Sequence, residues 1–149
     1  MNRDLMQKLI LWRMDPLRMP LILRGARQVG KSWLVRSFGE HFNTFIELNF
    51  EEDADACSLF EGKLDIPKIM EKIGFYTGKK ITPGETLLFL DEVQECPQAI
   101  KSLRFFKENY PQLHVIAAGS LLDFILEKIG LPVGRVQFMY LYPLSFGEF

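Results

Sequence analysis

Four residues near the start of the chain have the types and spacing of a phosphate-binding loop. Gly25, Gly30, Lys31 and Ser32 match the pattern G-x-x-x-x-G-K-[ST] at every fixed position. Glycines let the backbone turn so that consecutive N–H groups face phosphate oxygens, and the helix that follows adds the positive charge of its N-terminus. We expect Lys31 to reach the β- and γ-phosphates of a nucleotide and Ser32 to offer its hydroxyl to Mg²⁺. The alternative is a simple glycine-rich turn.

The same loop defines the expected nucleotide contacts. The predicted contacts are Gly25, Ala26, Arg27, Gln28, Val29, Gly30, Lys31, Ser32 and Trp33. Within this set Arg27 occupies a variable position of the pattern, so its side chain is expected to face solvent or a partner domain rather than phosphate.

Two adjacent acids follow a short apolar run later in the chain. Leu87–Leu90 reads as a buried strand, and Asp91 and Glu92 come directly after it. Ligands of open α/β sheets bind at the carboxyl ends of the strands, so both carboxylates are expected at a ligand site. Asp91 would hold Mg²⁺ through water, and Glu92 would orient and deprotonate an attacking water. The alternative is a pair of solvated acids at a strand exit.

Ser120 and Arg135 are the remaining candidates for contact with the reacting phosphate. Ser120 follows the apolar run that ends at Gly119, and it could sense the γ-phosphate or the attacking water. Its alternative role is to cap a helix beginning at Leu121, and the two roles are compatible. Arg135 could contact a γ-phosphate of its own or a neighbouring chain, or it could be a charge on a surface loop. The predicted catalytic residues are Glu92, Lys31, Ser120 and Arg135.

These residues need a framework that brings them to one edge, and the apolar periodicity predicts one. Predicted strands are Pro20–Leu23, Thr44–Phe50, Thr86–Leu90, His114–Ala118 and Val136–Tyr142. Predicted helices are an opening segment that stops near Pro16, Lys31–Gly39, two short segments within Asp53–Gly74 that separate near Pro67, Pro97–Asn109 and Leu121–Lys128. Strands that alternate with helices and are apolar throughout predict an α/β fold with a parallel sheet covered on both faces.

Length and charge favour a single soluble domain. The chain has 149 residues, 48% of them hydrophobic and 25% charged, which is enough for one core. Its 18 basic and 19 acidic side chains leave a formal charge of -1, so nucleic acid is a possible partner that the charge does not support. No apolar run is long enough to span a bilayer, so we expect no membrane partner and a cytoplasmic location.

The remaining polar residues are interpreted as structural. Cys57 and Cys96 lack the spacing of a zinc site, and both a lone disulfide and two free thiols stay open. The acidic run from Glu51 to Asp55 is expected to be a solvated loop, and His114 is expected to be structural.

The end of the sequence has the pattern of a helix start. Ser145–Glu148 has the S-x-x-E form of a capping box, and the sequence stops at Phe149. We therefore expect the chain, residues 1–149, to be one domain of a longer protein, truncated at its C-terminal end.

Several segments together resemble a family of prokaryotic AAA-type ATPases, in which this domain is followed by a C-terminal domain of unknown function. The segments are Leu21–Ser32, Leu88–Gln94, Gly119–Ser120, Gly134–Arg135 and Tyr142–Phe149. The resemblance implies ATP and Mg²⁺ as ligands and a three-layer P-loop NTPase fold with strand order 5-1-4-3-2. It also implies that the C-terminal domain is missing from this chain; a homo-oligomer is compatible with it.

Three functions are compatible with this reading. The leading one is an ATPase whose turnover drives a conformational change in attached or partner domains. The second is a nucleotide-dependent switch with little turnover, and the third is a P-loop kinase. A kinase of this fold would need an arginine-rich lid and a GTPase would need an N-K-x-D motif, and the sequence has neither.

Overall fold

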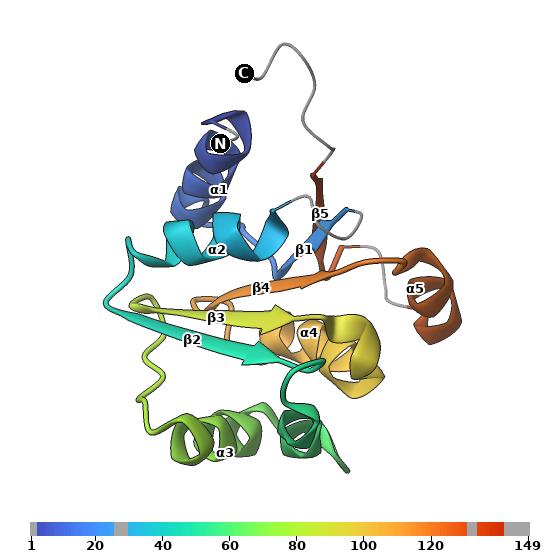
Figure 1. Ribbon diagram of the computed structural model, residues 1–149. Coiled ribbons are helices and arrows are strands. Elements are labelled where there is room, and N and C mark those ends of the chain that lie inside the picture. Colours follow the sequence, from blue (N-terminus) through green and yellow to red (C-terminus); the bar gives the residue numbers. More distant parts are fainter. Residues whose placement is uncertain (1–2, 26–29, 131–133, 142–149) are drawn as a thin grey trace.

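The computed structural model describes residues 3–25, 30–130 and 134–141, which form alternating helices and strands (Figure 1). The strands are β1 (Leu21–Arg24), β2 (Thr44–Asn49), β3 (Thr86–Asp91), β4 (His114–Gly119) and β5 (Gln137–Tyr140). The helices are α1 (Arg3–Met14), α2 (Lys31–Gly39), α3 (Ile66–Thr77), α4 (Pro97–Asn109) and α5 (Asp123–Ile129), with short 3₁₀ helices η1 (Ala54–Phe60) and η2 (Val93–Glu95). Within the described ranges, no helix is long and apolar enough to cross a bilayer.

All five strands lie in one parallel sheet in the order β2-β3-β4-β1-β5. This order is 5-1-4-3-2 read from the other edge, so the predicted α/β fold and strand order are confirmed. In a parallel sheet every strand ends at the same edge, so the segments that follow β1, β3 and β4 come together there.

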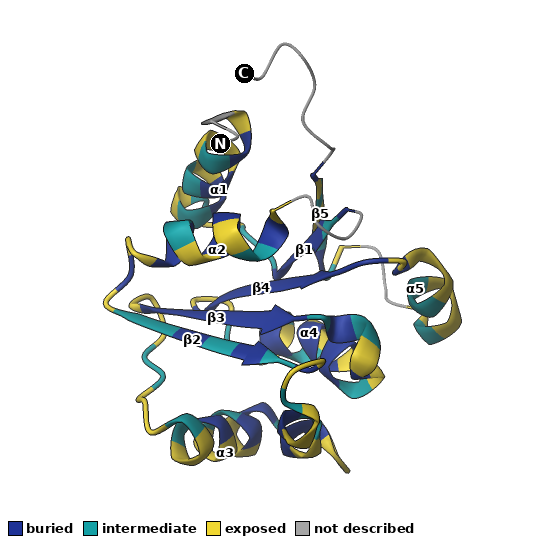
Figure 2. Cartoon of the chain, in the orientation of Figure 1, coloured by how far each residue is buried: buried dark blue, intermediate teal, exposed yellow. Residues whose placement is uncertain are grey.

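Two apolar cores cover the two faces of the sheet. Helices α1 and α2 pack on one face, while η1, α3 and α4 pack on the other (Figure 1). Alternate residues of β3 serve the two cores: Leu87 and Phe89 face α1 and α2, and Leu88 and Leu90 face α4. Because β3 and β4 are buried on both faces, their sequences are apolar without alternation (Figure 2).

Some element boundaries differ from the prediction. The helix expected at Leu121 begins at Asp123, because Leu121 has a φ of 54° and this left-handed turn cannot belong to an α-helix. Pro67 does not separate two helices but lies in the first turn of α3, where a missing N–H costs nothing. The last strand is Gln137–Tyr140; Tyr142, its expected end, lies outside the described residues.

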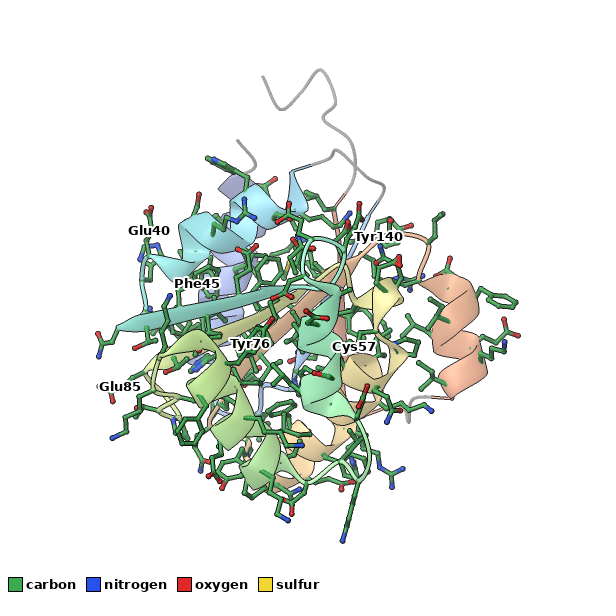
Figure 3. The ribbon with its side chains drawn as sticks, turned by 60° about the horizontal axis from the view of Figure 1, so that its bottom comes forward. Glu40, Phe45, Cys57, Tyr76, Glu85 and Tyr140 are labelled. Atoms are coloured by element: carbon green, nitrogen blue, oxygen red, sulfur yellow. A yellow bond between two sulfur atoms is a disulfide. The ribbon has the colours of Figure 1, made fainter. Side chains whose placement is uncertain are left out.

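Cys57 and Cys96 form a disulfide, which decides between the two open readings of the cysteines. The bond joins η1 to the residue that precedes α4, with the two Cα atoms 5.7 Å apart. Figure 3 labels Cys57 on η1. The disulfide closes a long loop that contains all of α3 and β3, so it restricts the unfolded chain as well as the folded one.

His114 lies in an aromatic cluster beneath α1. Its ring makes edge-on contacts with Phe42 at 5.0 Å and Trp12 at 5.7 Å between centroids, and Nε2 lies 3.3 Å from the carbonyl oxygen of Arg13. Burial, together with the positive charges of Arg18 and Arg13, lowers the pKa of His114 from its ordinary 6.5 to about 4. The ring is therefore neutral in the folded protein at neutral pH, in accord with a structural role.

This burial predicts a pH dependence of stability. Between pH 6.5 and about 4 the unfolded chain binds a proton at His114 that the folded protein does not, so stability should fall as the pH falls through this range. The slope from this group approaches about 1.4 kcal/mol per pH unit. Urea denaturation across this range should show that His114→Gln loses this part of the slope. An identical slope in both proteins would contradict the assignment.

Candidate phosphate-binding and catalytic site

The predicted phosphate loop connects β1 to α2 at the carboxyl edge of the sheet. Gly25 follows β1, and Gly30 directly precedes α2. Gly30 has a φ of 86°, which strains any residue with a side chain, so the glycine is needed for the chain to turn into the helix. Ala26, Arg27, Gln28 and Val29 lie outside the described residues.

Lys31 is buried at the start of α2. Its side chain is 8% exposed, and Nζ donates a hydrogen bond of 2.9 Å to the carbonyl oxygen of Gly25. The ammonium group therefore lies between the two ends of the loop, next to the positive N-terminus of α2. A buried ammonium group beside a helix N-terminus is an arrangement that could bind an anion.

A hydrogen bond between Ser32 and Asp91 connects α2, the helix that follows the predicted loop, to the end of β3. Ser32 Oγ donates a 2.5 Å hydrogen bond to Asp91 Oδ2, and Asp91 Oδ1 accepts a 2.9 Å bond from the backbone N–H of Glu92. Asp91 is only 2% exposed, and this burial raises the pKa of its carboxyl, while the bonds from Ser32 and Glu92 act to lower it. The structure thus brings together two residues that are 59 positions apart in the sequence.

The oxygens of this pair fit Mg²⁺. A hydroxyl and a carboxylate are hard oxygen donors, which is the ligand type that Mg²⁺ binds, usually with several waters retained. A nearby dication would also favour the ionised form of the buried Asp91 carboxyl. Ser32 and Asp91 are therefore the residues of this chain that could hold the metal.

Glu92 lies beside the pair in a strained backbone conformation. Its φ of 54° is in the left-handed region, which costs a non-glycine residue about 1–2 kcal/mol and is common at functional sites. Burial raises the pKa of Glu92, and the nearby carboxyls of Glu51 and Asp91 raise it further, while a hydrogen bond from Gln94 acts to lower it. The half-buried carboxylate thus has both a fixed backbone and a specific set of polar neighbours.

Ser120 lies at the same edge, directly after β4. It is 3% exposed, and β4 pairs with β1 on one side and β3 on the other, as the predicted sensor role requires. The predicted capping role is wrong, because α5 begins only at Asp123 and no side chain caps its first turn. Leu121 redirects the chain between Ser120 and the helix.

Arg135 lies near the amino ends of the strands, opposite the edge at which the predicted loop follows β1. It precedes β5, whose first residue Gln137 pairs with Leu21 at the start of β1, whereas the loop follows the end of β1. Arg135 Nε is 3.3 Å from Glu108 Oε1 near the end of α4. The predicted contact between Arg135 and a phosphate bound by the same chain is therefore not possible in this arrangement. Contact with a nucleotide on a neighbouring chain stays a prediction.

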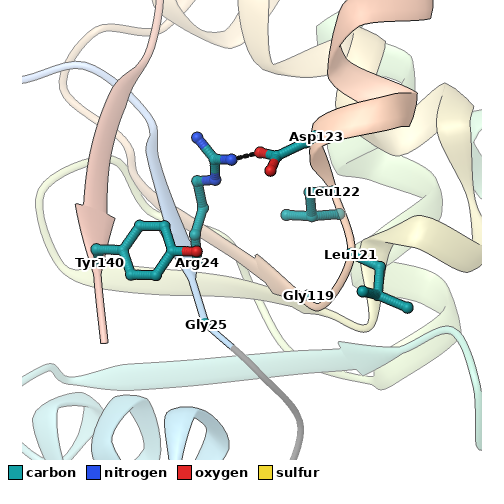
Figure 4. A pocket seen from close by; sticks show the side chains of 7 residues that line it. All are labelled: Arg24, Gly25, Gly119, Leu121, Leu122, Asp123 and Tyr140. Carbon is teal, nitrogen blue, oxygen red and sulfur yellow. Dashed lines mark ion pairs between the residues drawn. The ribbon is translucent and has the colours of Figure 1, made fainter. Parts of the chain in front are cut away.

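A small cavity adjoins the loop where β1, β4 and β5 end (Figure 4). Its volume is about 170 Å³, and it is lined by Arg24, Gly25, Gly119, Leu121, Leu122, Asp123 and Tyr140. The guanidinium of Arg24 pairs with Asp123 and lies 5.5 Å from the ring centroid of Tyr140. The volume is below the range of about 300–1,000 Å³ that is usual for ligand pockets.

Sequence reasoning missed two polar residues around Glu92. Gln94 was noted only as part of the resemblance, and Glu51 was interpreted as one acid of a solvated loop. The loop is indeed largely exposed, but the Glu51 carboxyl also acts on Glu92. Only the two-residue spacing from Glu92 could have drawn attention to Gln94. Trp33, a predicted nucleotide contact, is 50% exposed on α2.

The comparison with protein families agrees with this geometry. Residues 17–149 match the family model described as an AAA domain. The chain belongs to this AAA domain family. No curated protein matches the chain. Membership of the AAA domain family indicates a nucleotide-binding, ATPase-like module.

For this AAA domain, Lys31→Ala should weaken the binding of ATP with Mg²⁺. The substitution removes the buried positive charge at the start of α2, and a hydrogen bond to a charged group is worth about 1.5–3 kcal/mol, or roughly 10- to 150-fold in affinity. Calorimetry or titration with a fluorescent nucleotide would measure the loss. Lys101→Ala, which removes an exposed lysine of α4, is the matched control and should bind as the parent does. Equal affinity of both variants would exclude the phosphate-loop assignment.

Proposed function

We propose that this AAA domain binds ATP with Mg²⁺ and hydrolyses it, and that turnover drives a conformational change in attached or partner domains. The observation that carries the proposal is the hydrogen bond from Ser32 to the buried carboxylate of Asp91. It joins the start of α2 to the end of β3, which Glu92 directly follows. The candidate phosphate loop, the candidate metal ligands and the proposed base therefore lie at the same edge of the sheet.

Binding would rest on the loop and on Lys31. The backbone N–H groups at the start of α2 and the Lys31 ammonium favour a polyphosphate, and ATP would displace the Gly25 carbonyl as the partner of Nζ. Ser32 and Asp91 would hold Mg²⁺, which neutralises charge on the phosphates when bound.

Glu92 would accept the proton of the attacking water. The water oxygen forms a bond to the γ-phosphorus, the bond to the β–γ bridging oxygen breaks, and the proton moves to a Glu92 carboxylate oxygen. Burial raises the pKa of this carboxyl toward the range in which a general base works best. Ser120, buried at the neighbouring strand exit, is proposed to contact the γ-phosphate or the water.

Arg135 could act only between chains. It lies at the sheet edge away from its own loop and is 44% exposed, so a homo-oligomer would be needed to bring it to a nucleotide. Its pairing with Glu108 would then have to be exchanged for contact with phosphate. Analytical ultracentrifugation with and without ATP would test for such an oligomer.

Glu92→Gln should separate binding from chemistry in the full-length protein. The amide keeps the shape of the side chain but cannot take the proton, so turnover should fall by about 10²- to 10⁴-fold while ATP affinity changes little. Steady-state phosphate release and a nucleotide titration would measure the two quantities. Asp91→Asn should instead lower affinity and Mg²⁺ dependence together.

Glu95→Gln is the matched control for this experiment. Glu95 is an exposed acid of η2, close to Glu92 in the chain, and its variant should hydrolyse ATP as the parent does. Parent-like turnover of Glu92→Gln would contradict the hydrolytic role. Tight binding without turnover in the parent protein would favour the nucleotide-dependent switch.

A further inference from the structure

We infer that Gln94 is a positioning residue: its side-chain amide packs against Gly119 and holds the Glu92 carboxylate in place through a hydrogen bond. The inference rests on the proposed role of Glu92, because Gln94 would act on the reaction only through that carboxylate. It adds a residue to the site for which neither the loop pattern nor the acidic pair supplies a role.

The first observation is a direct contact between the two side chains. Gln94 Nε2 donates a hydrogen bond of 3.2 Å to Glu92 Oε1. With the amide turned the other way, its oxygen would face an ionised carboxylate and repel it, so the donor orientation is the favourable one. The bond restricts one carboxylate oxygen of Glu92, and the Glu51 carboxyl also acts on this side chain.

The second observation concerns the other end of the same amide. Gln94 Oε1 is buried and has no hydrogen-bond partner among the residues that the structure describes. A buried polar atom without a partner lowers stability, and natural proteins keep such groups mainly where they have a function. An amide kept in this costly position is better explained by its bond to Glu92 than by packing.

The third observation is the space that Gly119 leaves for this amide. A Cβ at Gly119 would lie 2.5 Å from Gln94 Oε1, closer than real Cβ contacts. The backbone of Gly119 does not have a positive φ, so the turn itself does not require glycine. The Gln94 amide lies against the Cα of Gly119, so a side chain at this position would displace the amide.

These contacts join the segment that follows β3 to the end of the neighbouring strand β4. Gln94 and Glu92 follow β3, whereas Gly119 ends β4 and precedes Ser120. The position of the Glu92 carboxylate thus depends on the end of the strand that carries Ser120. If Gln94 had only a structural role, it would stabilise η2 but would not affect the rate of hydrolysis through Glu92.

The test measures rates and affinities of the full-length protein in single-turnover hydrolysis of ATP with Mg²⁺. Gln94→Leu keeps the approximate size but removes the donor, and Gly119→Ala displaces the amide without altering Gln94. Gln98→Leu, a half-buried glutamine of α4, is the matched control. We expect Gln94→Leu and Gly119→Ala to lower the rate about 10- to 100-fold with unchanged ATP affinity, and Gln98→Leu to behave as the parent.

A double-mutant cycle with Glu92→Gln identifies the route of the effect. If Gln94 acts through Glu92, Gln94→Leu should cause no further loss in the Glu92→Gln background. An equal loss in both backgrounds, or a parent-like rate for both Gln94→Leu and Gly119→Ala, overturns the inference. If Glu92→Gln is slow while both of these variants are normal, the proposed function stands and only the inference fails. If Glu92→Gln is itself normal, both fail.

Discussion

The buried carboxylate of Asp91 is the constraint on which the site depends. A carboxyl group that is 2% exposed loses its hydration, and this burial is tolerated only if nearby donors replace the water. Ser32 and the backbone N–H of Glu92 supply these donors. This requirement holds the start of α2 against the end of β3 and sets the backbone of Glu92 at the same time. The phosphate loop and the acidic pair are therefore parts of one hydrogen-bonded unit.

The sheet provides the frame in which that unit can form. Strand β4 lies between β1 and β3, so the segments that follow these three strands are neighbours although they are far apart in the chain. Burial on both faces gives β3 and β4 continuous apolar sequences. By contrast α5, which leads away from Ser120, has no buried residue among those described. Its residues Ile125, Leu126 and Ile129 pack against the core while partly exposed, and Asp123 pairs with Arg24.

Polar residues around Glu92 affect the position and the pKa of its side chain. The left-handed backbone of Glu92 and the bond from the Gln94 amide restrict this side chain, while burial and the nearby carboxyls of Glu51 and Asp91 raise its pKa. A strained φ and a buried amide oxygen each lower stability when taken alone. Such features persist where the surrounding fold holds them in place, here through the buried ends of β3 and β4.

Features that depend on local pattern can be predicted from the amino-acid sequence alone. Apolar runs without alternation predict the strands and their burial, and the spacing of Gly25, Gly30, Lys31 and Ser32 predicts the loop. The family resemblance implies the strand order, and the structure agrees with it. Other features became evident from the folded chain: Arg135 precedes the start of β5, Ser120 does not cap α5, and Cys57 bonds Cys96. The packing of the Gln94 amide against Gly119 likewise became evident only from the folded chain. Each of these depends on contacts between segments that are distant in the chain, and no local spacing encodes such contacts.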